Sequence, residues 1–182
     1  MSPPFPRAAV SIAVRVQINN IARYALIQRA NEPNKGLWSL PGGKIQLGEG
    51  TIQAARRELE EETGLKVMDD NSYRLRWYES GPFTCSDSIH FYQGRPGEHE
   101  HVHPVKYHYV IAQCFAEVDC SNLRAPPTLV ASDDALDAKW LTFEEIMEGV
   151  KKGELTKGVG DVYKRAENLY KAGLLCFEDA EF

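Results

Sequence analysis

Three glutamates, Glu58, Glu61 and Glu62, stand at i, i+3 and i+4 in a segment with helical character. At about 100° per residue, this spacing places the three carboxylates on one flank of a helix. Like charges at these spacings repel, and each contact costs an isolated helix roughly 0.2–0.5 kcal/mol. A cluster of oxygen ligands is what hard cations such as Mg²⁺ prefer. The spacing therefore indicates metal-assisted chemistry, although many glutamate-rich helices are only solvated faces.

The residues that precede the helix supply further parts of such a site. Gly42 and Gly43 allow a bend at which a backbone carbonyl, that of Gly43, can join a metal and the chain can approach a ligand closely. Arg57 lies on the next flank of the helix and is a candidate partner for Glu49 in the preceding loop. Such an ion pair would fix the loop against the helix.

The helix that carries the glutamates has clear boundaries in the sequence. It is predicted over 51–63, with Thr51 as the N-cap and Gly64 as the C-terminal stop. Ile52, Ala55 and Leu59 fall on one stripe, which we expect to be buried.

The pattern Gly-x5-Glu-x7-Arg-Glu-apolar-x-Glu-Glu-x-Gly-apolar is the signature of the Nudix hydrolase family, and residues 43–65 resemble it at every position. The Leu-Pro-Gly-Gly sequence that leads into this segment and the stretch 132–140 also look like the family. The resemblance runs loosely over residues 8–150. It implies an α/β/α sandwich with a mixed β-sheet, in which the signature forms a loop–helix–loop catalytic motif.

The same resemblance implies an activity and roles for individual residues. The family hydrolyses nucleoside diphosphates that are linked to another moiety, and it uses Mg²⁺ or Mn²⁺. Glu58 and Glu62 would be the leading metal ligands, and Glu61 a third ligand or a close neighbour of the metals. Arg57 and Glu49 would orient the helix. Metals neutralise the diphosphate and lower the pKa of a bound water, and a nearby carboxylate can then remove its proton.

A second pair of carboxylates lies far along the chain from the helix. In the family, a loop carboxylate near Asp133 and Asp134 often completes the metal site or acts as the base. A simple Asp-Asp turn is the alternative for these two residues. Glu98 and Glu100, on a different loop, are competing candidates for the same role.

The substrate is less well specified than the chemistry. ADP-ribose hydrolases of the family tend to carry a proline about sixteen residues after the signature, and Pro82 lies at a similar place. With the stretch 132–140, this resembles the small ADP-ribose pyrophosphatase group and favours cleavage of ADP-ribose to AMP and ribose 5-phosphate. One alternative is a nucleoside triphosphate pyrophosphohydrolase that acts on damaged or non-canonical nucleotides. Another is a catalytically idle Nudix module that senses a nucleotide.

Aromatic and histidine residues offer further ligand contacts. Four aromatic side chains could stack on a nucleobase or belong to the core; these are Trp38, Phe83, Tyr92 and Trp140. All five histidines lie within 90–108, where they either bind a metal such as Zn²⁺ or form part of a polar surface loop.

The remaining pattern predicts the elements that position these residues. Alternation and β-branched residues predict strands at 8–18, 24–28, 73–84, 88–92, 105–118 and 135–141, and 37–40 is a short apolar run that ends at Pro41. A capping box at Thr142 opens a helix that runs to about Lys151, and a last helix is predicted over 161–172. Strands with a few inserted helices are typical of an α/β domain with a mixed sheet covered by helices.

Length and charge set the outer limits. The 182 residues predict one domain over 1–182, with a core at about 8–150 and a helical segment at about 157–182 that packs on the domain or on a second subunit. We expect a homodimer. A net charge of −5 disfavours binding to a nucleic-acid polymer, and no apolar run is long enough to span a membrane. Four cysteines without a C-x-x-C pair favour a reducing, cytoplasmic location.

Overall fold

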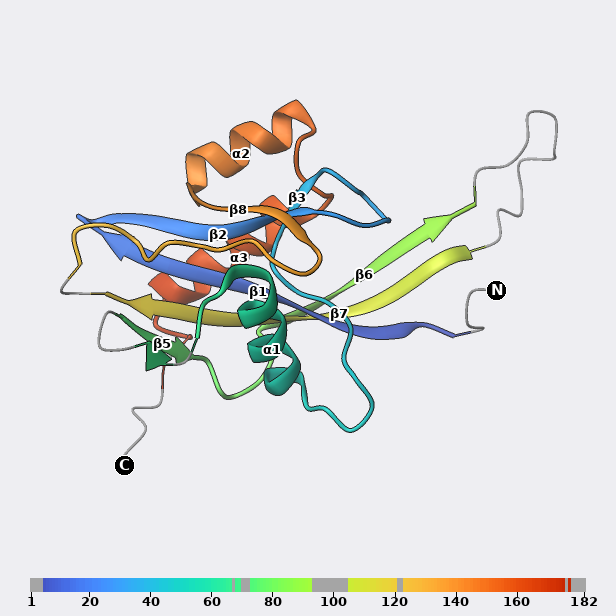
Figure 1. Ribbon diagram of the computed structural model, residues 1–182, viewed down its shortest axis with the longest axis horizontal. Helices are drawn as coiled ribbons and strands as arrows, with labels where there is room; N and C mark the ends of the chain where they lie inside the picture. Colours follow the sequence, from blue (N-terminus) through green and yellow to red (C-terminus); the bar gives the residue numbers. More distant parts are fainter. Residues whose placement is uncertain are drawn as a thin grey trace.

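A computed structural model of the chain describes residues 5–66, 68–69, 73–92, 105–120, 123–175 and 177. In this part of the chain, one mixed sheet is covered by helices on both faces (Figure 1). The strands are β1 (Arg7–Ile18), β2 (Ile21–Arg29), β3 (Trp38–Ser39), β4 (Met68–Asp69), β5 (Tyr73–Trp77), β6 (Thr84–Phe91), β7 (Val105–Asp119) and β8 (Ala135–Thr142). The helices are α1 (Thr51–Thr63), α2 (Phe143–Lys152) and α3 (Val159–Lys171).

The strand order explains the mixed character of the sheet. The path runs β3-β2-β1-β7-β5-β4, while β8 pairs with β2 and β6 pairs with β7. The pair of β1 with β7 is parallel and the other strand pairs are antiparallel. β6 and the first part of β7 run together away from α1 (Figure 1).

Two apolar clusters, one on each face of the sheet, form the core. Alternate residues of β1, among them Ile12 and Val14, pack with Leu59 of α1. The opposite face of β1 presents Ala13, which belongs to a second cluster with Tyr163 of α3. Because β1 is central and covered on both faces, most of its residues are apolar, as is usual for such a strand. The predicted α/β/α sandwich with a mixed sheet is confirmed.

The structure corrects some local predictions. The N-cap of α1 is Gly50 rather than Thr51, because the Gln53 side chain accepts a hydrogen bond from the Gly50 amide at 2.8 Å and closes the first turn there. The predicted strand over 73–84 is two strands, β5 and β6, since a turn at 78–83 separates them. α3 begins at Val159, two residues earlier than predicted.

The most informative correction concerns the buried side of α1. The buried arc includes the predicted Ala55 and Leu59, but it is centred on Glu58 and Glu62, and Ile52 lies at its partly exposed edge. Glu58 and Glu62 therefore do not flank the buried stripe but form part of it, whereas Glu61 is exposed.

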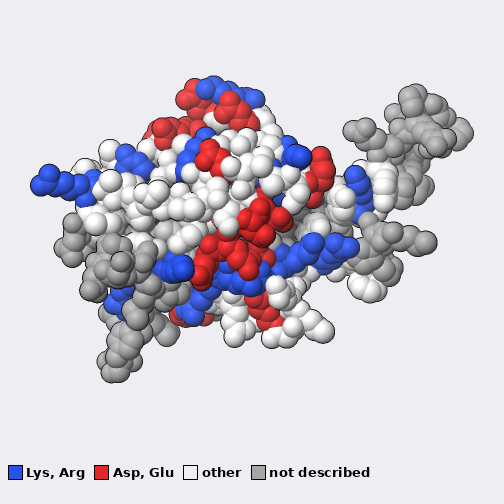
Figure 2. Space-filling view, viewed as in Figure 1, with Lys and Arg blue, Asp and Glu red and all other residues white. Residues whose placement is uncertain are grey.

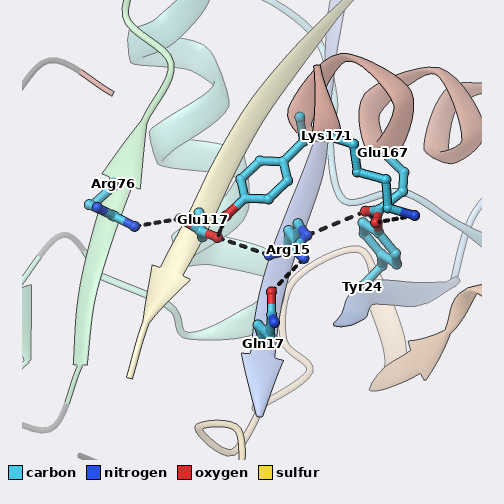
Figure 3. A network of polar contacts seen from close by, with 8 residues as sticks. Arg15, Gln17, Tyr24, Arg76, Glu117, Glu167 and Lys171 are labelled. Carbon is cyan, nitrogen blue, oxygen red and sulfur yellow. Dashed lines mark hydrogen bonds and ion pairs between the residues drawn. The ribbon is translucent and has the colours of Figure 1, made fainter. Parts of the chain in front are cut away.

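A buried polar network attaches α3 to the sheet (Figure 3). Arg15 of β1 donates to Glu117 of β7 at 3.0 Å and to Glu167 of α3 at 3.3 Å. Tyr24 also donates to Glu167, and Tyr170 donates to Glu117 at 2.7 Å. The network thus links α3 to β1 and β7, and Arg15 and Glu117 within it are almost fully buried. Among the described helices, none is long and apolar enough to cross a membrane.

Candidate active site

Two glutamates of α1 are almost fully buried. Glu62 is 3 % exposed and Glu58 is 9 % exposed. One carboxylate oxygen of Glu62 accepts a hydrogen bond from the Gly42 amide at 2.7 Å. Burial raises the pKa of Glu62 to about 8, and burial also raises the pKa of Glu58. Without a cation nearby, Glu62 therefore holds a proton at neutral pH.

The loop before α1 brings two glycines against these carboxylates. Its backbone runs beside β1, where the Gly43 carbonyl accepts a hydrogen bond from the Val10 amide at 2.9 Å. At Gly42, φ is +148°, and an added Cβ would collide with the backbone of β1. At Gly43, an added Cβ would occupy the place of the Glu58 carboxylate. Only glycine allows the close approach at position 42, whereas a side chain at position 43 would have to displace the Glu58 carboxylate.

Arg57 joins the loop to the helix, as the sequence predicted. Its guanidinium donates to both carboxylate oxygens of Glu49, at 2.8 and 2.9 Å. It also donates to Glu58 at 2.8 Å and to Glu61 at 3.0 Å. The hydrogen bonds from Arg57 lower the pKa of Glu49 to about 2, so this carboxylate stays charged.

Asp133 and Asp134 approach the glutamates from the loop before β8. Asp133 adopts a left-handed backbone conformation, with φ of +54°, and Asp134 accepts a hydrogen bond from Asn31 at 2.6 Å. Both line the cavity that also holds Glu58 and Glu62. After burial, negative charge at Asp133 and Asp134 is a further reason why the pKa values of the two glutamates are raised. The two aspartates therefore form a turn and also face the site.

The acidic side chains open onto one large cavity. Its other walls come from β1, β6, β7, the loop after β2 and α3. Figure 2 shows the acidic side chains gathered near the centre of one face, with basic side chains beside them. Glu61, which is exposed, stands at the rim of this cluster. The structure thus brings together most residues that the sequence singled out; these are Gly43, Arg57, Glu58, Glu61, Glu62, Asp133 and Asp134.

The donor set fits a hard divalent cation. It consists of carboxylate oxygens, two of them on the buried side chains of Glu58 and Glu62, and burial disfavours the charged form of both. In the part of the chain that the structure describes, no group of three acidic, histidine or cysteine side chains is arranged to hold a metal ion. Arg57 holds Glu58 and Glu61, and Gly42 holds Glu62. A metal would replace some of these hydrogen bonds.

Comparison with known proteins identifies this arrangement. The family model of the NUDIX domain matches residues 6–165. The chain belongs to the Nudix family. The residues of the Nudix signature are therefore those of the loop and α1 described above.

Individual relatives match only part of the chain. An ADP-ribose pyrophosphatase of Methanocaldococcus jannaschii is 44 % identical over 55 residues, which are 30 % of this chain and 32 % of that protein. An octanoyltransferase of Myxococcus xanthus is 46 % identical over 72 residues, 39 % of this chain and 20 % of that protein. The chain thus spans between a fifth and a third of the length of these curated relatives.

Solved Nudix structures share the fold over almost the whole chain. The NUDIX domain of Shewanella oneidensis NrtR, solved with ADP ribose, has a TM-score of 0.61 and 16 % identity, and the match covers 93 % of this chain and 91 % of that one. At this identity the likeness concerns the fold.

Two residues that the sequence singled out lie away from the Nudix cavity. Trp38 packs against the second apolar cluster, which includes Tyr163 of α3, and the Lys139 ammonium lies 3.7 Å from the centre of the Trp38 ring. Pro82 is exposed in the turn between β5 and β6. Neither residue lines the cavity.

Of the other aromatic and histidine residues that the sequence singled out, His90 alone among those described lines the cavity. Phe83 and Trp140 pack against the two apolar clusters, whereas Tyr92 is exposed at the end of β6. His90 lines the cavity beside Ser88, and His108 pairs with Asp87. The other predicted histidines and acids of this region lie outside the described residues; these are Glu98, His99, Glu100, His101 and His103.

Sequence reasoning missed the polar residues on the cavity floor. Ser11, Gln113 and Ser86 line the cavity from three neighbouring strands. A signal was present, because Gln113 interrupts the apolar stretch of β7 and Ser11 interrupts that of β1. Polar residues inside buried strands need hydrogen-bond partners, and those partners could not be assigned without the strand register.

Proposed function

We propose that this chain is a metal-dependent hydrolase that cleaves the diphosphate bond of a nucleoside diphosphate linked to another moiety. The observation that carries the proposal is the pair of buried carboxylates, Glu58 and Glu62, packed against Gly42 and Gly43 at the edge of the cavity. Burying two carboxylates in their charged form is unfavourable. A divalent cation would offset their negative charge and would also bind the negatively charged diphosphate.

The metal, Mg²⁺ or Mn²⁺, would be held by Glu58 and Glu62, with Glu61 and the Gly43 carbonyl close by. When bound, it neutralises the diphosphate and makes a water molecule acidic. Arg57 keeps the Glu58 carboxylate in place through its hydrogen bond, and its ion pair with Glu49 fixes the loop.

A carboxylate from the loop before β8 can accept the proton of the attacking water. Asp133 and Asp134 are exposed to the cavity, so either can take a proton and release it to solvent. Their electrostatic interaction with Glu58 and Glu62 in the same cavity supports this role better than a role as a turn alone.

ADP-ribose is the substrate that we propose, with AMP and ribose 5-phosphate as products. Support comes from the relative named as an ADP-ribose pyrophosphatase and from the NrtR domain solved with ADP ribose. A homodimer in the cytoplasm remains part of this proposal.

The test combines a substrate panel with three variants. ADP-ribose, nucleoside diphosphate sugars, dinucleoside polyphosphates and oxidised triphosphates are incubated with Mg²⁺, and the products are separated by chromatography. Glu58→Gln and Glu62→Gln should each lower kcat at least 100-fold. Glu60→Gln is the matched control, because Glu60 is exposed and pairs only with Lys66 among the described residues.

Binding of Mn²⁺, measured by calorimetry, gives a second readout. It should weaken in Glu58→Gln and Glu62→Gln and stay unchanged in Glu60→Gln. Release of pyrophosphate from a triphosphate would replace the ADP-ribose assignment with the triphosphate alternative. Nucleotide binding without turnover of any substrate would instead favour the idle sensing module and contradict the proposed hydrolase.

A further inference from the structure

A chain of neutral hydrogen bonds crosses the floor of the cavity from β1 to β6. The Ser11 hydroxyl donates to the Gln113 carbonyl oxygen, and the Gln113 amide nitrogen donates to the Ser86 hydroxyl at 2.8 Å. Gln113 is 3 % exposed, yet all three residues line the cavity. We call these three residues the amide strip. Gln113, at the buried centre, is hydrogen-bonded on both sides, so the orientation of its side-chain amide is fixed before any ligand binds.

The amide strip begins beside the loop that holds Gly42 and Gly43. The backbone of Ser11 lies directly against Gly42, whose amide binds Glu62. From there the strip crosses from β1 to β7 and then to β6. Neighbouring strands are about 4.8 Å apart, so the strip covers on the order of 10 Å. This is about the distance from the phosphate of a nucleotide to the far edge of its base.

The amide strip has hydrogen-bonding capacity left for a ligand. Ser86 accepts a hydrogen bond from Gln113, so its own hydroxyl proton is available to donate. The second amide proton of Gln113 also has no partner among the described residues. These groups carry no charge, and they suit the polar edge of a heterocycle better than a phosphate.

The same face of β7 also offers a surface for a flat ring. Gln113, Ile111 and Tyr109 alternate along the strand, so their side chains point to one side, and all three line the cavity. An apolar and an aromatic side chain next to a fixed amide form a common type of binding site for a planar, partly polar ligand.

We propose that the amide strip binds the nucleobase of the substrate and that Gln113 determines which base is preferred. This inference rests on the proposed function, because the diphosphate must lie at Glu58 and Glu62 for the base to reach the strip. It assigns selectivity to the base rather than to the group beyond the diphosphate.

The test uses substrates that differ only in the base. ADP-glucose, GDP-glucose and UDP-glucose are compared by kcat/KM in the wild type and in Gln113→Leu. We expect the wild type to prefer one base by roughly 10-fold or more, because a site built to hydrogen-bond a ligand rejects analogues that leave its polar groups unpaired. Gln113→Leu should remove most of this preference, through KM rather than kcat.

A matched control separates selectivity from stability. Gln28 of β2 is also partly buried in a strand and donates to the Gly36 carbonyl at 2.9 Å, but it does not line the cavity. Gln28→Leu should lower stability and leave the base preference unchanged. Ser86→Ala is a second variant at the partly exposed end of the strip, for use if Gln113→Leu does not fold. It should reduce the base preference in the same direction.

Binding of AMP, GMP and UMP without metal, measured by calorimetry, makes the two proposals separable. A wild type that turns over no substrate contradicts the proposed hydrolase, whatever it binds. Equal binding of the three nucleotides, or no binding of any, overturns the amide-strip inference. The inference is also overturned if Gln113→Leu weakens the use of all three bases equally.

Discussion

At the scale of single residues, the decisive feature is that the carboxyl group of Glu62 is buried. Its pKa is raised to about 8 by burial, against an ordinary value of 4.5. The hydrogen bond from Gly42 opposes this shift but does not cancel it. The charged form of Glu62 therefore destabilises the metal-free fold, and a bound cation would stabilise that charged form.

This environment predicts a pH dependence of stability. Between about pH 4.5 and 8, the native metal-free protein binds more protons at Glu62 than the unfolded chain does, so Glu62 makes stability fall as pH rises. In EDTA at pH 8, Glu62→Gln should unfold at a midpoint higher than wild type by on the order of 5 °C. The gain should shrink at pH 5. Scanning calorimetry at both pH values measures it, and an equal gain at both would contradict the assignment.

Arg57 is the second residue whose environment allows a prediction. Its planar guanidinium contacts Glu49, Glu58 and Glu61 together, which the single ammonium of lysine cannot do. Arg57→Lys should lower kcat at least 10-fold, because the Glu58 carboxylate and the loop lose their fixed positions.

The neighbouring Arg56 provides the control for this change. It pairs with Glu79 at the surface, away from the glutamates of α1. Arg56→Lys should leave kcat within about 2-fold of wild type, as expected for an exposed ion pair. Steady-state kinetics on the best substrate compares the two variants, and equal losses would argue against a positioning role for Arg57.

At the scale of elements, the loop between β3 and α1 must lie between a strand and a helix. Its backbone pairs with β1 on one side and faces the glutamates of α1 on the other. Gly42 has a positive φ and no room for a side chain, whereas Gly43 lacks room only because the Glu58 carboxylate occupies the space. The two glycines therefore have different roles.

Gly43→Ala should test the loop without unfolding it. An added methyl group would displace the flexible end of Glu58, so Mn²⁺ affinity should fall at least 10-fold while the unfolding midpoint changes little. Gly48→Ala is the control, because an added Cβ there meets nothing within 4 Å. Its positive φ of +84° should cost about 1 kcal/mol of stability without affecting the metal. Unchanged Mn²⁺ affinity in Gly43→Ala, measured by calorimetry, would contradict this role.

At the scale of the whole molecule, the buried network of Figure 3 connects the sheet to the helix that walls the cavity. Arg15 and Glu117 belong to neighbouring strands, and Glu167 belongs to α3. Aromatic residues complete it, since the guanidinium carbon of Arg15 lies 4.0 Å from the centre of the Tyr170 ring. Removal of Arg15 would leave the buried Glu117 and the part-buried Glu167 without the guanidinium that they share, although Tyr170 and Tyr24 would still donate to them.

Arg15→Met should therefore lower the free energy of unfolding by about 3–5 kcal/mol. Lys152→Met breaks an exposed pair with Glu148 on α2 and should cost less than about 1 kcal/mol. Urea denaturation measures both. Similar small losses in the two variants would show that the network is not important for attaching α3.

The sequence by itself determined the Nudix segment and most of the elements. The spacing of Glu58, Glu61 and Glu62, the bend at Gly42 and Gly43, and the pair of Arg57 with Glu49 are local features. They depend on helix periodicity and on residues close along the chain. Alternation and capping residues likewise specified most of the strands and α2, because these signals act over a few positions.

Only the tertiary structure decided which side chains meet. It buried Glu58 and Glu62, brought Asp133 and Asp134 to the same cavity, and left Trp38 outside it. It also aligned Ser11 with Gln113 across the parallel pair of β1 and β7. The physical reason is that burial and pKa depend on packing between distant segments, and that a strand register one residue different would reverse every side chain.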